Sequence, residues 1–64
     1  MFWVECKSMK SASPKGALAQ AINDNKTPET KMPIAVCKDN RKEPTVTMLF
    51  SDFIELMKEY MERS

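Results

Sequence analysis

The chain opens with an alternating segment, FWVECK (residues 2–7), in which aromatic and β-branched side chains predominate. Such side chains favour a β-strand, and successive residues of a strand point to opposite faces of its sheet. Glu5 and Lys7 are therefore predicted to share one face, while Val4 and Cys6 line the other. A carboxylate that can ligate a divalent cation, beside a lysine that can polarise a water molecule, is the minimal equipment for metal-assisted phosphodiester hydrolysis.

The length of 64 residues allows one small domain, 1–64, with a core of marginal size. The sequence contains two cysteines, Cys6 and Cys37, and no histidine. Both cysteines lie in apolar, strand-like segments, so we expect two buried thiols rather than a disulfide or a metal pair. The composition therefore argues against a zinc site and against acid–base chemistry by histidine.

Charge is unevenly spread along the chain. Residues 1–44 carry eight Lys or Arg against five acids, and residues 45–64 carry two against four. A mildly basic body with an acidic tail is compatible with a surface that faces phosphates, and equally with a solvated mixed surface. No apolar run approaches the ~18 residues of a membrane span, and the N-terminus lacks the pattern of a signal peptide. We therefore expect a cytoplasmic protein with reduced thiols and no membrane partner.

A helix is predicted over residues 14–23. Ser13 is a favourable N-cap, and Pro14 fits the first helical position because its missing N–H costs nothing there. Small and apolar side chains recur at helical spacing and predict the buried stripe Ala17, Leu18, Ala21 and Ile22.

The second half of the chain predicts two strands and another helix. Residues 33–37 form a continuous apolar run, which is typical of a strand covered on both faces. A polar segment, 38–44, joins it to a strand over 45–50, and the pair predicts a β-hairpin. Ser51 is then expected to cap a helix over 52–62 with an apolar stripe that contains Phe53, Ile54, Met57 and Met61.

The predicted order is β-α-β-β-α. A strand, a helix and a second strand at this spacing imply a right-handed crossover, which makes strands 2–7 and 33–37 parallel. With the hairpin, the prediction is a single α/β domain built on a small mixed sheet.

With this order of elements, the segment Glu5-Cys6-Lys7 resembles the (D/E)-x-K motif of the PD-(D/E)XK nuclease superfamily, and more loosely its Holliday-junction-resolvase-like branch of phage and archaeal endonucleases. The resemblance covers the motif strand, the following polar loop, the crossover helix with Gln20, and the next two strands. It implies the C-terminal half of a restriction-endonuclease-like fold.

The resemblance implies a metal-dependent DNA endonuclease of phage type, with branched DNA as one possible substrate. Glu5 and the backbone carbonyl of Cys6 would ligate Mg²⁺ or Mn²⁺, and Lys7 would orient or deprotonate the attacking water. Phosphate contacts that do not read the base sequence are expected from basic or amide side chains. These DNA-binding candidates are Lys10, Lys15, Gln20, Lys38, Arg41 and Lys42, although Gln20 also fits an ordinary exposed helical position.

The sequence departs from the family at the acidic residue that precedes the motif strand in other members, because Met1 is followed directly by that strand. One carboxylate binds a hydrated divalent cation poorly. Activity is therefore expected only in an assembly, with the second acid supplied by another copy, as in a homo-oligomer or dimer, or by a separate N-terminal half.

Two further interpretations remain open from the sequence. In the first, the chain is a non-catalytic remnant of the nuclease fold that binds DNA or protein. The six methionines would supply adaptable apolar surface for that binding. The chain is also compatible with a small structural protein in which Glu5 and Lys7 are an ordinary surface pair. Dependence on a metal ion separates the enzyme from both.

Overall fold

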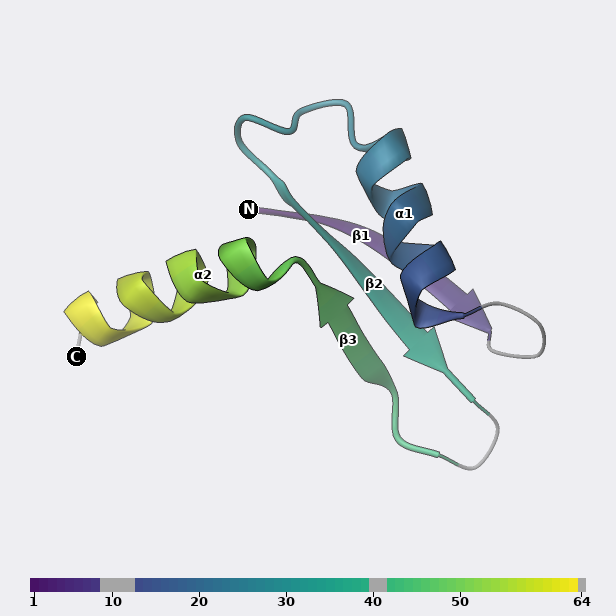
Figure 1. Cartoon of the computed structure of the whole chain (residues 1–64). Helices are drawn as coiled ribbons and strands as arrows, with labels where there is room; N and C mark the ends of the chain where they lie inside the picture. Colours follow the sequence, from purple (N-terminus) through teal and green to yellow (C-terminus); the bar gives the residue numbers. More distant parts are fainter. Residues whose placement is uncertain (9–12, 40–41, 64) are drawn as a thin grey trace.

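The computed structural model describes residues 1–8, 13–39 and 42–63. In chain order the described residues form β1 (Phe2–Ser8), α1 (Pro14–Asp24), β2 (Met32–Lys38), β3 (Thr45–Met48) and α2 (Phe50–Arg63) (Figure 1). The predicted order β-α-β-β-α is confirmed, and the strand and helix bounds differ from the prediction by a few residues at most.

The described strands form one mixed sheet in the order β1-β2-β3. β1 and β2 are parallel, with Glu5 opposite Ala35 and Lys7 opposite Cys37. β2 and β3 are antiparallel, with Ala35 opposite Thr47. The small α/β fold and the parallel pairing across the helix crossover are therefore as predicted.

Helix α1 begins and ends where the sequence indicates. The Ser13 side chain accepts a hydrogen bond from the backbone N–H of Gly16 at 3.0 Å, and Pro14 occupies the first turn. At the other end, the Asn25 backbone N–H donates to the carbonyl of Ala21 at 3.0 Å. Ser13 is thus the N-cap, as predicted, and satisfies one of the amides that the first turn leaves unpaired.

The core lies between α1 and one face of the sheet. Ala17, Leu18, Ala35 and Cys37 form one buried cluster, and Ala35 is completely inaccessible to solvent. Small side chains on both surfaces let the helix backbone approach the sheet closely. The prediction that Ile22 belongs to this buried stripe is wrong, since Ile22 is 44% exposed and the α1 residues in the buried cluster are Ala17 and Leu18.

The other face of the sheet is uncovered within the described residues. We call it the open face; strand register assigns to it Phe2, Val4, Cys6, Ile34, Val36, Val46 and Met48. Val4 is 50% and Val46 is 60% exposed. The prediction that strand 33–37 is covered on both faces is wrong, since Ile34 and Val36 stay only half-buried. The prediction of two buried thiols holds for Cys37 but not for Cys6, which points to the open face and is exposed.

Helix α2 begins earlier than expected. β3 ends at Met48, Phe50 is already helical, and the Phe53 N–H donates to the carbonyl of Leu49 at 3.0 Å. Ser51 therefore lies inside the helix and is not its N-cap. No described residue of α2 is buried, and the helix extends beyond the end of the sheet (Figure 1).

Trp3 has a packing partner that the sequence did not indicate. The Lys31 ammonium lies 5.7 Å from the centre of the indole ring, within the range of a cation–π interaction. Asn25 positions this lysine, because its Nδ2 donates to the Lys31 carbonyl at 2.9 Å while its Oδ1 accepts from the Thr27 N–H at 3.0 Å. Trp3 is therefore half-buried against its own chain.

Candidate functional site

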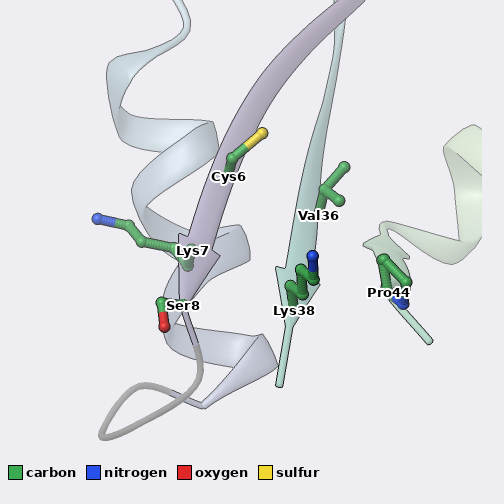
Figure 2. A pocket seen from close by; sticks show the side chains of 6 residues that line it. All are labelled: Cys6, Lys7, Ser8, Val36, Lys38 and Pro44. Carbon is green, nitrogen blue, oxygen red and sulfur yellow. The ribbon is translucent and has the colours of Figure 1, made fainter. Parts of the chain in front are cut away.

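Glu5 and Lys7 lie on the same face of β1, as predicted. Both are half-buried, and strand register places them on the face that α1 covers, with Ala35 and Cys37. β1 pairs with β2 along one edge, and among the described strands its other edge is unpaired. Figure 2 shows the Lys7 side chain pointing away from Cys6, to the opposite side of the strand.

Glu5 and Lys7 do not form an ion pair with each other. Within the described ranges, the side-chain pair that meets a 4.0 Å limit is Lys42 Nζ with Asp39 Oδ2, both largely exposed. A surface ion pair of that kind contributes little to stability. The geometry leaves the charges of Glu5 and Lys7 available to a ligand or to another chain.

The described residues do not fit a magnesium ion. They contain no group of three or more His, Cys, Asp or Glu side chains that are close enough to hold a metal. Asp24 ends α1, Asp39 follows β2 and Asp52 lies in α2, so none is on the strand that carries Glu5. Because a hard cation requires several oxygen ligands, the proposed pair of Glu5 and the Cys6 carbonyl is not a metal site by itself.

Basic residues from four segments are located toward one end of the sheet. Lys7 is next to the carboxyl end of β1, Lys38 ends β2, Lys15 lies in the first turn of α1, and Lys42 is in the turn before β3. We call these four residues the basic end. Parallel strands bring their carboxyl ends to one edge, and the crossover helix begins at that same edge.

The other predicted DNA contacts are not part of this group. Gln20 lies in the second half of α1 and is exposed, the ordinary position that the sequence left open for it. Lys10 and Arg41 lie outside the described residues. Of the predicted set, Lys15, Lys38 and Lys42 are thus located toward the same end of the sheet, where Lys7 also lies.

A shallow hollow on the open face was not foreseen. It has a volume of about 440 Å³ and is lined by Cys6, Lys7, Ser8, Val36, Lys38 and Pro44 (Figure 2). Cys6 and Val36 supply its apolar wall, and Lys38 stands at the side nearest the carboxyl end of β2. Alternation along each strand could have shown which residues share a face with Cys6 and which share a face with Lys38. Only the register between β1 and β2 shows that Cys6 and Lys38 lie on the same face.

No family model, no curated protein and no solved structure matches this chain. Neither of the described helices is both long enough and apolar enough to cross a membrane.

Proposed function

We propose that this chain binds the phosphate backbone of DNA through its basic end, as a non-catalytic module of nuclease-like fold. The observation that carries the proposal is that Lys7, Lys15, Lys38 and Lys42, from four separate segments, are located toward the carboxyl end of the parallel strands, with Lys7 and Lys38 on opposite faces of the sheet. Asp39 and Glu43 lie in the same turn region, so the patch is moderately rather than strongly basic.

Contacts of this kind position DNA without reading its sequence. Neutralising about four phosphates gives a slope of log K against log salt near −3 to −4, and non-specific complexes of this class have Kd values of about 10⁻⁴–10⁻⁶ M. We therefore expect weak binding that depends strongly on salt and differs little between DNA sequences.

The test compares two double variants with the same change in charge. Lys15→Ala with Lys38→Ala removes half of the basic end, while Lys26→Ala with Lys58→Ala removes two exposed lysines elsewhere. Fluorescence anisotropy with duplex and branched DNA, as a function of salt, should show weaker binding and a slope smaller by about 2 for the first variant only. Equal losses in both variants would show that net charge, and not this end of the sheet, carries the binding.

A second candidate function is metal-dependent hydrolysis of DNA in an assembly. Glu5 and Lys7 share one face of β1, and β1 has an unpaired edge in the described sheet. A strand from another chain, added along this edge, would bring its side chains beside Glu5. Mg²⁺ or Mn²⁺ would require further carboxylates from that chain, because Glu5 alone does not hold it. The resemblance to phage endonucleases of the PD-(D/E)XK superfamily favours this candidate.

Cleavage assays on branched and linear DNA test the second candidate. Activity should require Mg²⁺ or Mn²⁺, stop with chelator, and disappear in Glu5→Ala and in Lys7→Ala but not in Lys26→Ala. Cleavage that survives both substitutions would refute the assignment of these two residues. Binding without cleavage in the wild-type chain would favour the non-catalytic module.

We also propose a cytoplasmic setting. Cys6 and Cys37 are free thiols on opposite faces of adjacent strands, where they cannot form a disulfide with each other. A reducing compartment suits this arrangement.

A further inference from the structure

Two apolar surfaces lack cover in the described chain. One is the open face of the sheet. The other is a stripe along α2, which we define as Phe50, Phe53, Ile54 and Met57. Phe50 is 75% exposed, and its ring stacks on that of Phe53 with the centroids 6.5 Å apart. Exposed apolar patches of this kind mark sites of association in soluble proteins.

Within one chain α2 lies near Met1 and Met32, at the amino ends of β1 and β2, and does not run across the open face (Figure 1). Leu49 is the single residue between β3 and α2, whereas connections between a strand and a helix that packs on the same sheet usually contain about 2–6 residues. So short a connection directs α2 past the end of β3, and Figure 1 shows the helix extending away from the sheet. A helix from another molecule is free of this restriction.

We propose that a second copy of this chain covers the open face with its α2, and that the exchange is reciprocal. The dimensions match: a 14-residue helix is about 21 Å long, and the seven-residue strands β1 and β2 are about 23 Å long. Reciprocal exchange of one element about a two-fold axis closes the assembly at a dimer.

Charge favours the same partner. The polar side of α2 carries Asp52, Glu55, Glu59 and Glu62 against Lys58 and Arg63, so the helix is net acidic. The rest of the chain carries eight basic and five acidic residues. Among the described residues, the basic side chain on the open-face side of its hollow is Lys38, which an acidic helix complements, whereas Lys7 borders the hollow from β1 and points to the other face.

The expected contact area fits a weak dimer whose population depends on protein concentration. A helix of about 21 Å with a diameter near 10 Å covers roughly 200 Å² of sheet in projection. Two reciprocal contacts, each removing accessible surface from both partners, bury roughly 800 Å², an area below the ~1,200 Å² of standard interfaces and in the range of weak association. The β-branched open face and the paired phenylalanines supply the apolar centre that such interfaces require.

Thiol reactivity reports directly on cover of the open face. Cys6 is exposed in the single chain, and Cys37 is buried beneath α1 and serves as an internal control. At high protein concentration, where light scattering should give the mass of a dimer, labelling of Cys6 should be at least about tenfold slower than after dilution. Labelling of Cys37 should be slow at both concentrations.

Two matched pairs of variants locate the interface. Val46→Lys places a charge on the open face, and Thr45→Lys places the same charge on the opposite side of β3. Ile54→Glu interrupts the α2 stripe, and Ser51→Glu adds the same carboxylate to its polar side. We expect Val46→Lys and Ile54→Glu each to give monomers with fast-reacting Cys6 and retained circular dichroism, while the two controls remain dimeric.

Two results would overturn the proposal. One is a wild-type chain that is monomeric at high concentration with a fast-reacting Cys6. The other is a dimer that tolerates both Val46→Lys and Ile54→Glu, which would place the contact elsewhere. Neither readout involves DNA, so the outcome is independent of the proposed function.

Discussion

The two faces of the sheet differ in what covers them, although the same three described strands build both. On the closed face, α1 lays Ala17 and Leu18 against Ala35 and Cys37, and the contact excludes water. On the open face, larger β-branched side chains such as Val4 and Val46 remain at least half exposed. The smaller side chains make the tighter packing, because close approach of backbones gains more contacts than bulk alone.

The two helices sharpen this contrast. α2 has the cleaner separation of apolar and polar sides, yet none of its described residues is buried, whereas α1 buries Ala17, Leu18 and Ala21. An amphipathic pattern states that a helix has an apolar side to cover. The pattern does not show whether the surface that packs on this side belongs to the same chain. For α2, the one-residue connection after β3 directs the helix away from its own sheet.

The largest effect is expected from the core of the closed face. Leu18→Ala should remove about 2–5 kcal/mol of the free energy of unfolding, because truncation of a buried leucine leaves a cavity. A chain of this size has roughly 3–5 kcal/mol in total, so the variant should be largely unfolded. Urea titration followed by circular dichroism measures the change.

The matched control for Leu18→Ala is Val46→Ala on the open face. At a concentration where the chain is monomeric, Val46→Ala should change the urea midpoint little, because Val46 is already 60% exposed. Equal destabilisation by both substitutions would contradict the difference between the faces.

A smaller effect is expected at the turn that follows α1. Asn25 is buried and makes two hydrogen bonds, to the Lys31 carbonyl and from the Thr27 N–H. Asn25→Ala leaves both backbone groups unpaired and should lower the free energy of unfolding by about 1–3 kcal/mol. Asn23→Ala, at an exposed position of α1, is the control and should change it much less. Tryptophan fluorescence should also change in Asn25→Ala only, since this turn holds Lys31 against Trp3.

The smallest expected effect on stability comes from removing the serine at the start of each helix. Ser13→Ala removes the side chain that accepts from Gly16 and should cost about 0.5–2 kcal/mol. Ser51→Ala should be nearly neutral, because Ser51 lies inside α2 and alanine favours a helix interior. Thermal denaturation of the two variants side by side is sufficient. A larger loss in Ser51→Ala than in Ser13→Ala would show that α2 begins at a different residue from the one described.

The candidate site was predictable in part. The two-residue period of a strand was enough to place Glu5 and Lys7 on one face, and the parallel pairing of β1 with β2 confirmed their setting in the sheet. The location of Lys7, Lys15, Lys38 and Lys42 toward one end of the sheet was not evident, because it depends on how segments that are far apart in the sequence are arranged. The sequence also did not show which face of the sheet α1 covers, because β2 carries apolar side chains on both faces.

The sequence by itself determined the order of the elements, the start of α1 at Ser13 and the alternation along β1, because periodicity and capping depend on neighbours within a few residues. The tertiary structure decided that Cys6 and Ile22 are exposed, that β2 is covered on one side, and that Phe50 begins α2. Burial depends on which distant surface reaches a side chain, and local sequence does not encode that distance. For the open face of this protein, that surface is expected on a second molecule.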